Sequence, residues 1–214
     1  GYNSLSSIEF ARSKILQIKL ANHFKLDVPK TYVGNNYEKI KKFIKKNKFR
    51  NQLIIKPLIG LGWYKKKKFY KINPQFFDLK KIKKENFKLF PVIIQEYVEK
   101  KFEYRITIVN KNFFICRIDN QKSKNSLHKL DFRYADISQT PYEISDLPNQ
   151  FKNKILKLMS YFKLNIAAID VVLGTDNKLY FLEINPMFEW LWIEQLTGMK
   201  ISKAIAETLI KKSV

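Results

Sequence analysis

Two side chains near the carboxyl end of the chain, Glu183 and Asn185, have the types and the spacing of ligands for a hard cation. They close the strand-like run LYFLEIN at 179–185, just before Pro186. Side chains of a strand alternate between its two faces, so residues two positions apart lie on the same face. Both residues offer oxygen atoms, so this strand end predicts either a metal site or a structural polar cap.

A third oxygen ligand, Asp170, belongs to the preceding strand-like run. The turn residues Gly-Thr-Asp-Asn at 174–177 predict a hairpin over 166–185. A register centred between positions 176 and 177 places Asp170 directly opposite Glu183, on the same sheet face. Two facing carboxylates need a cation between them, and an all-oxygen set with two charges suits Mg²⁺. The alternative is that both carboxylates lie on a solvent-exposed face and pair with lysines.

Arginine is rare in this chain, which makes its positions informative. Only five of the 41 basic residues are arginine, and three of these, Arg105, Arg117 and Arg133, fall between positions 105 and 133. Arginine binds a carboxylate or phosphate through two parallel hydrogen bonds, which lysine cannot do. These three residues are therefore candidates for binding an anionic ligand, with ordinary surface ion pairs as the alternative.

The formal net charge of +22 raises the possibility of a nucleic-acid-binding protein. The excess is nearly all lysine, and no arginine-rich base-reading motif or regular series of aromatic stacking residues accompanies it. Nucleic-acid binding is therefore disfavoured as the main function. No apolar run approaches the roughly 20 residues that a membrane helix needs. The single cysteine, Cys116, excludes an internal disulfide and fits a reducing compartment, so we expect a cytoplasmic, folded protein. A homo-oligomer stays open.

The elements that must position these side chains mix helical and strand-like patterns, which predicts an α+β fold. Helical patterns cover 6–24, 36–47, 78–89, 149–164 and 201–212. Strand-like patterns cover 26–34, 51–58, a glycine-containing hairpin at 60–72, 90–98, two strands within 104–119 and the hairpin at 166–185. The segment 119–148 is polar and irregular.

The run AAIDVVLGTDNKLYFLEINP at 167–186 resembles the carboxyl-terminal motif of the ATP-grasp superfamily. The resemblance implies that Asp170, Glu183 and Asn185 hold Mg²⁺ ions that bridge the phosphates of ATP. Further matches follow in the family's order: Lys14 and Lys56 as phosphate lysines, and IIQEYV at 93–98 as the adenine hinge, with Gln95, Glu96, Tyr97 and Val98 as ATP-binding residues. In EYRITIV, Glu103 corresponds to a residue near the ribose and Arg105 to one near the transferred phosphate.

Within that superfamily the chain is most similar to the microviridin-type peptide maturases that make graspetides. Three features carry this likeness: CRIDNQ at 116–121, DFR at 131–133, and the tryptophan-containing turn and helix after Asn185. The resemblance implies that Arg117, Asp131 and Arg133 contact an acidic precursor peptide, and that Arg105, Arg117 and Arg133 are catalytic. It leaves no counterpart for that family's amino-terminal pre-grasp domain, which these 214 residues are expected to lack.

The resemblance predicts an ATP-grasp ligase of two lobes, 1–94 with the phosphate lysines and 95–214 with the hinge, metal ligands and arginines, and ATP and Mg²⁺ between them. The predicted reaction activates an Asp or Glu side chain of a ribosomally made peptide as an acyl phosphate and forms an ester or amide cross-link. Two alternatives stay open: an amino-acid ligase that acts on a protein or peptide terminus, and a non-catalytic module that binds nucleotide or peptide.

Overall fold

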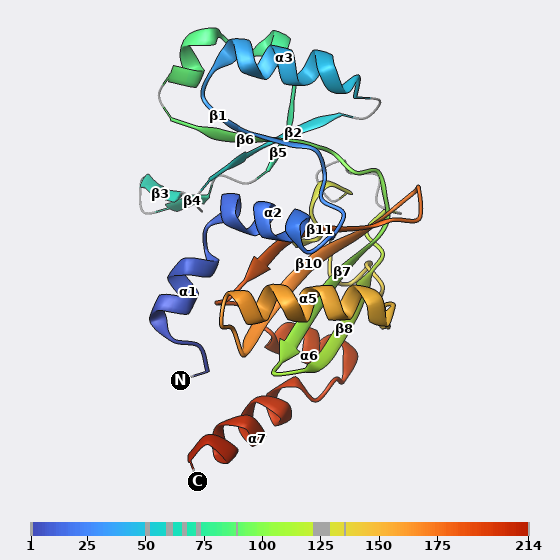
Figure 1. The fold of residues 1–214 in the computed structure, drawn as a ribbon. Coiled ribbons are helices and arrows are strands. Elements are labelled where there is room, and N and C mark those ends of the chain that lie inside the picture. The colour runs from blue at the N-terminus through green and yellow to red at the C-terminus, as the bar shows by residue number, and fades with distance from the viewer. Residues whose placement is uncertain are drawn as a thin grey trace. The chain divides into compact units, whose positions relative to one another are not determined.

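The computed structural model describes residues 2–49, 52–58, 62–65, 68–71, 74–88, 90–121, 129–134 and 136–213. These residues form two compact units, one made of Gly1–Val28 with Lys100–Val214 and the other of Pro29–Glu99. Figure 1 shows the elements of both units. This grouping differs from the predicted division at 94/95, because the first 28 residues pack with the carboxyl-terminal part of the chain.

The unit of residues 29–99 contains a four-stranded antiparallel sheet in the order β1-β6-β2-β5. Its strands are β1 (Thr31–Gly34), β2 (Leu53–Pro57), β5 (Gln75–Phe77) and β6 (Val92–Glu96). Helix α3 (Tyr37–Asn47) buries Ile40 in a core that also contains Leu53, Phe77 and Phe87. The predicted hairpin appears as β3 (Gly62–Lys65) and β4 (Lys68–Lys71), and its remaining residues, 60–61, 66–67 and 72, lie outside the described ones.

The other unit contains a five-stranded antiparallel sheet in the order β11-β10-β7-β8-β9. Its strands are β7 (Lys100–Val109), β8 (Asn112–Ile118), β9 (Tyr142–Ile144), β10 (Ile166–Gly174) and β11 (Leu179–Asn185). Helices α1 (Leu5–Ala11), α2 (Lys14–His23), α5 (Asn149–Tyr161), α6 (Leu191–Thr197) and α7 (Ile201–Ser213) complete it.

Helices cover both faces of this five-stranded sheet. Helices α2 and α5 pack on one face against Ile106, Ile169 and Phe181, and α5 runs across the strands in front of the sheet in Figure 1. Helices α6 and α7 pack on the other face, against Val109, Cys116 and Ile166 among others. Cys116 is fully buried there, and burial raises the pKa of its thiol to about 12. The second face also carries polar residues along β7, β10 and β11.

The β10–β11 hairpin has an irregular register. Near the turn, Leu173 pairs with Leu179 and Val171 with Phe181, so the three-residue loop is centred on Asp176. Asn177 has the left-handed conformation, with φ of 64°, that such loops commonly place at their last position. A β-bulge then adds one residue on β11, and beyond it Asp170 pairs with Glu183.

Two helical predictions are corrected by the structure. The pattern at 6–24 is two helices, because Ser13 leaves the helix and its side chain accepts a hydrogen bond from the amide of Leu16 as the cap of α2. The pattern at 78–89 forms only short 3₁₀ turns, η1 (Leu79–Lys81) and η2 (Lys84–Lys88). The two turns are separated by Ile82, whose backbone is extended with φ of −116° and ψ of 126°. The other predicted helices are present as α3, α5 and α7.

Candidate metal and phosphate site

The three predicted metal ligands lie together on one face of the β10–β11 hairpin. Asp170 is paired with Glu183 and Ala168 with Asn185, so Asp170, Glu183 and Asn185 project from the same face. Asn185 Nδ2 lies 3.2 Å from Asp170 Oδ2 and 3.3 Å from Glu183 Oε1. The predicted clustering of two carboxylates and one amide is therefore present in the structure.

Arg105 joins this cluster from the neighbouring strand β7, where it is the register partner of Asp170. Its Nη1 donates to Asp170 Oδ1 at 2.8 Å, and both side chains are about nine-tenths buried. Its Nε is also buried and has no hydrogen-bond partner among the residues that the structure describes. Such a donor is costly to leave unsatisfied, so the arrangement favours an acceptor that belongs to a ligand.

Burial raises the pKa of the Asp170 carboxyl above its ordinary range. The charge of Arg105 opposes that rise, and the nearby Glu183 carboxylate adds to it. A second cation in this cluster would lower the free energy of the doubly ionised carboxylate pair.

Lys14 supplies a further positive charge from the first turn of α2. Its Nζ lies 3.9 Å from Glu183 Oε2, with both side chains about one-quarter exposed. Its helix is held to β11 by Gln17, whose buried carboxamide bonds both backbone groups of Ile184. Our reading of the sequence missed Gln17. The polar type at a position on the buried face of a helix is the only signal that indicates it.

The donor set fits a magnesium ion in chemistry and number. Mg²⁺ takes oxygen ligands, commonly one or two carboxylates completed by phosphate and water. Asp170 and Glu183 supply the carboxylates, and Asn185 would supply its Oδ1 after a half-turn about its last side-chain bond. The described residues contain no group of three or more His, Cys, Asp or Glu side chains arranged for a metal. The candidate set is therefore this two-carboxylate and one-amide cluster.

Arg133 lies in the short 3₁₀ turn η3 (Phe132–Tyr134), and Asp131 lies just before it. The two side chains form a doubly hydrogen-bonded ion pair, with Nε–Oδ1 at 2.9 Å and Nη2–Oδ2 at 2.6 Å. Burial alone would raise the pKa of Asp131, but the hydrogen bond and charge of Arg133 outweigh it and lower that pKa. Burial opposes the charged form of Arg133, yet Asp131, followed by Glu183 and Asp170, raises its pKa. Arg133 thus lies within electrostatic range of the carboxylate cluster.

Arg117 is not brought to this cluster. Its register partner is Tyr104, so it projects from the sheet face opposite Arg105 and Asp170. Its guanidinium lies 4.6 Å from the ring centroid of Phe102 and pairs with Glu143 on β9. Its predicted catalytic and peptide-binding roles stay predictions.

Glu103 is on the same face as Arg105 but is buried and has partners within the unit. Lys100 Nζ donates to Glu103 Oε1 at 2.8 Å, and Asn120 Nδ2 donates to the same oxygen at 2.5 Å. Lys100 Nζ also donates to the carbonyl oxygen of Leu130 at 2.9 Å. Burial raises the pKa of Glu103, although Lys100 opposes that rise. These bonds fasten the start of the Asp131–Arg133 segment to β7, and the predicted ribose contact of Glu103 stays a prediction.

The remaining predicted ATP-binding residues belong to the unit of residues 29–99. Lys56 Nζ donates to Gln95 Oε1 at 2.8 Å, and Gln95 Nε2 donates to Thr31 Oγ1 at 2.9 Å. Because the Thr31 hydroxyl donates to the carbonyl oxygen of Pro29 at 2.6 Å, it accepts from Gln95, which turns the Gln95 carbonyl toward Lys56.

The backbone of the predicted adenine hinge follows β6. The amide of Glu96 donates to the Lys30 carbonyl oxygen and that of Tyr97 to the Gln52 carbonyl oxygen, each at 2.9 Å. The Tyr97 ring packs edge-on against Phe76, and Val98 is half-buried. The hinge segment is therefore anchored to two neighbouring backbone segments of its own unit.

The strand order, and the cluster of carboxylates and amide on the β10–β11 hairpin with Arg105 from β7, agree with the expected ATP-grasp protein. Residues 11–209 match the RimK-like ATP-grasp domain family. The chain therefore belongs to the RimK-like ATP-grasp family. ATP and Mg²⁺ are the cofactors of ATP-grasp proteins. Among the described residues, none of the helices has the length and apolar character needed to span a membrane.

Solved structures of peptide-associated ATP-grasp proteins are similar to this chain over nearly its full length. One is a Chryseobacterium gregarium RiPP-associated ATP-grasp ligase in complex with ADP and a leader and core peptide, at 29% identity and a TM-score of 0.87, covering 99% of this chain and 63% of that one. Another is the macrocyclase MdnC of Microcystis aeruginosa MRC bound with the precursor peptide MdnA, at 30% identity and a TM-score of 0.84. That match covers 99% of this chain and 65% of MdnC. This chain thus spans less than two thirds of the length of these relatives. No curated protein matches it.

Proposed function

We propose that this protein is an ATP-dependent ligase that activates an Asp or Glu side chain of a ribosomally made peptide and joins it to another side chain as an ester or amide. The observation that carries the proposal is the cluster of Asp170, Glu183, Asn185 and Arg105, with Lys14 at its edge. It combines a magnesium-type donor set with cations suited to phosphate. The similarity to ligases whose structures contain leader, core or precursor peptides supports a peptide as the substrate.

The chemistry requires two displacements. A peptide carboxylate oxygen first attacks the γ-phosphorus of ATP, the bond from that phosphorus to the bridging oxygen breaks, and ADP leaves. A hydroxyl or amine of the peptide then attacks the acyl phosphate carbon, inorganic phosphate leaves, and the nucleophile loses one proton. Phosphoryl transfer depends on positioning and charge neutralisation more than on covalent help from the protein.

The residues of the site are assigned roles within these steps. Asp170, Glu183 and Asn185 would hold Mg²⁺, which when bound neutralises charge on the phosphates. Arg105 lies beside these ligands with a spare buried Nε, so we assign it to the transferred phosphoryl group. Lys14 is assigned to the phosphates of the nucleotide, and Lys56, held by Gln95, to the same role in the other unit.

Arg133 is assigned to the acceptor carboxylate of the peptide. Its guanidinium is half exposed while its charge acts on Asp170 and Glu183, so it is accessible and close to the cluster in electrostatic terms. Its partner Asp131 orients it through two parallel hydrogen bonds. The alternative role for Asp131 is to take the proton of the nucleophile, which its lowered pKa disfavours.

Mass spectrometry of candidate precursor peptides, incubated with the protein, ATP and Mg²⁺, tests the proposal. Peptides rich in Ser, Thr, Lys, Asp and Glu, encoded beside the gene, are the substrates to use. Each ester or amide bond is expected to appear as the loss of one water. A mass gain of one amino-acid residue instead would support the terminal ligase. ATP binding without turnover in the presence of every peptide would support the non-catalytic module.

The matched control for that experiment is Glu183→Gln, which keeps the size of the side chain and removes one ligand charge. We expect it to lower Mg²⁺-dependent peptide modification by about a hundredfold or more, because it weakens both the metal site and the charge balance. Modification at the parent rate in this variant would remove the hairpin cluster from the proposed mechanism.

A further inference from the structure

Gln17 makes hydrogen bonds that link helix α2, which carries Lys14, to strand β11, which carries Glu183 and Asn185. Its side chain is almost completely buried in α2. Its Nε2 donates to the carbonyl oxygens of Ala11 at 2.7 Å and Ile184 at 2.9 Å. Its Oε1 accepts from the amide of Ile184 at 3.0 Å. The carboxamide therefore uses both amide hydrogens and its oxygen, and its orientation is fixed by the backbone groups around it.

This carboxamide takes the place of a neighbouring strand at the edge of the sheet. Strand β11 is the edge strand, and one of its two sides pairs with β10. On its other side, the amide of Phe181 donates to the carbonyl oxygen of Asp27 at 2.8 Å, and Gln17 bonds both backbone groups of Ile184. Peptide groups in an antiparallel pair exchange the same donor and acceptor. Gln17 therefore fixes the outer edge of β11 where the strand carries its ligands.

The fixed residue, Ile184, lies between Glu183 and Asn185 in the chain. Lys14 lies three residues before Gln17 on α2, on the same side of the helix, and its Nζ is 3.9 Å from Glu183 Oε2. The Gln17 side chain thus attaches helix α2, which carries a predicted phosphate lysine, to the backbone of the residue that lies between two predicted metal ligands. Ala11 at the end of α1 is the third attachment, which also fixes the corner before α2.

We propose that Gln17 is a positioning residue that couples Lys14 to the metal ligands Glu183 and Asn185. This inference rests on the proposed function. Gln17 touches neither nucleotide nor peptide in this role; it sets the spacing between a phosphate-binding cation and the carboxylate and amide. A first ligand shell displaced by such a change commonly loses about tenfold to hundredfold in metal affinity.

The experiment compares Gln17→Met with the parent protein, using ADP with and without Mg²⁺ as the probe. Methionine has a similar length and no hydrogen-bonding capacity comparable with the carboxamide. Calorimetry should show that the gain in ADP affinity given by Mg²⁺ falls about tenfold or more in the variant. Hydrogen exchange of the Ile184 amide should become faster, because its acceptor is gone.

Thr208→Val is the matched control for a loss of stability alone. Thr208 is a buried polar residue of α7 whose hydroxyl bonds Asn110 Nδ2 and the Ala204 carbonyl oxygen, outside the cluster. It should lower the melting temperature and leave the Mg²⁺ gain unchanged. Gln17→Glu is a second variant if the methionine protein does not fold: it retains an acceptor for Ile184 but sets a carboxylate against two carbonyl oxygens, and it should also lose the gain.

The possible results distinguish a failure of the positioning role from a failure of the proposed function. A parent-like Mg²⁺ gain in Gln17→Met, or an equal loss in Thr208→Val, would overturn the positioning role and leave the proposed function standing. A parent protein in which Mg²⁺ does not raise ADP affinity would overturn the proposed function and the positioning role together.

Discussion

The guanidinium of Arg105 is only partly used by the protein itself. Nη1 is bonded to Asp170, and the buried Nε has no partner among the described residues. An unsatisfied buried donor commonly costs about 1–3 kcal/mol. That cost is offset when a ligand oxygen arrives, so the residue is preorganised for an anion rather than for the stability of the free protein.

The substitution Arg105→Lys tests whether the guanidinium Nε of Arg105 binds a ligand oxygen. Lysine keeps the positive charge for Asp170 but loses Nε and the planar geometry. A hydrogen bond to a charged group is worth about 1.5–3 kcal/mol, so ATP turnover should fall about tenfold to hundredfold. A coupled assay of ADP release measures the rate. If turnover is unchanged, the spare Nε has no part in phosphoryl transfer.

The Asp131–Arg133 pair gives a prediction about acid stability. The folded pKa of Asp131 is lowered, so the pairing adds stability that is fully present above the ordinary carboxyl pKa of about 4. That contribution is lost as the pH falls through the lowered folded pKa. Asp131→Asn should therefore lower the melting temperature by roughly 2 °C at pH 6, and the difference should shrink below about pH 4. A difference that grows toward low pH would contradict the assigned pairing.

At the scale of elements, the sequence predicted most of the strands and the face that carries the ligands. Strand-like runs and turn residues predicted β7, β8, β10 and β11, and the ligand types predicted the polar face of the hairpin. The turn was placed half a residue away from its observed centre, and the bulge restored the predicted pairing of Asp170 with Glu183. The pairing was thus predicted correctly from a register that is wrong near the turn.

Other features of the site could not be read from local patterns. Gln17 and Lys100 are polar residues whose roles depend on partners 167 and 30 positions away. Arg117 resembles a site residue in type and neighbourhood, but strand alternation in β8 turns it to the other face. Such assignments need the pairing between strands, which hydrophobic periodicity alone does not specify.

Side chains from three strands of the four-stranded sheet form the hydrogen bonds that position Lys56, so a substitution at Thr31 tests this arrangement. Strand β1 provides Thr31, β6 provides Gln95 and β2 provides Lys56. Thr31→Val keeps the shape but removes the acceptor that orients Gln95. Since a neutral hydrogen bond contributes about 1 kcal/mol, ATP affinity should fall about fivefold.

Adenosine affinity should change much less than ATP affinity, because Lys56 is assigned to phosphate. Calorimetry with both ligands measures the difference. The control is Tyr32→Phe on the same strand, which removes a hydroxyl bonded to the Asn36 carbonyl oxygen. Equal losses for ATP and adenosine in Thr31→Val would place Lys56 away from the phosphates.

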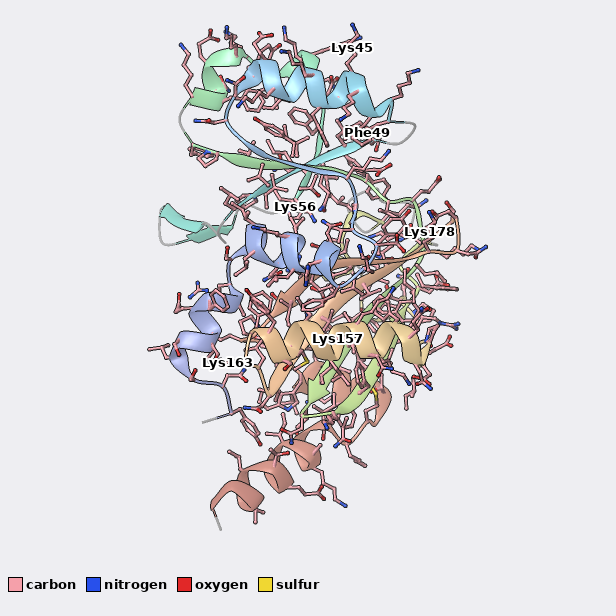
Figure 2. All side chains as sticks on the ribbon, in the orientation of Figure 1. Lys45, Phe49, Lys56, Lys157, Lys163 and Lys178 are labelled. Atoms are coloured by element: carbon pink, nitrogen blue, oxygen red, sulfur yellow. The ribbon has the colours of Figure 1, made fainter. Side chains whose placement is uncertain are left out.

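At the scale of the whole molecule, the positive charge is distributed over both units. Exposed lysines occur on α3 at Lys45, on α5 at Lys157, after it at Lys163 and at the β10–β11 turn at Lys178, as Figure 2 shows. A distributed charge of this kind raises the local concentration of acidic ligands without selecting one geometry. Selection is then left to the few arginines.

Two variants test whether the surface lysines only attract acidic ligands while the arginines select among them. Changing Lys45, Lys157, Lys163 and Lys178 to Gln removes four of the 22 net positive charges. Solvated charges contribute little individually, so modification of an acidic peptide at about 0.15 M salt should change less than about threefold. Arg133→Lys leaves the net charge intact and should lower it about tenfold or more. The reverse ranking would assign peptide recognition to the polycationic surface.

The extra residue in β11 shifts the alternation of that strand's side chains between the two sheet faces by one position. On the turn side of the bulge, Phe181 points into the core shared with α2 and α5; beyond it, Glu183 and Asn185 point to the polar face, and Ile184 returns to that core. With Leu182 deleted, Phe181 and Glu183 would be consecutive and would lie opposite Val171 and Asp170, which are consecutive on β10, so Glu183, Ile184 and Asn185 would keep their faces. Deletion of Ile184 would instead place Asn185 opposite Ile169, with its side chain toward the core. Among the residues of this strand end, Leu182 is therefore the position where the loss of a single residue should leave the ligand set on its face.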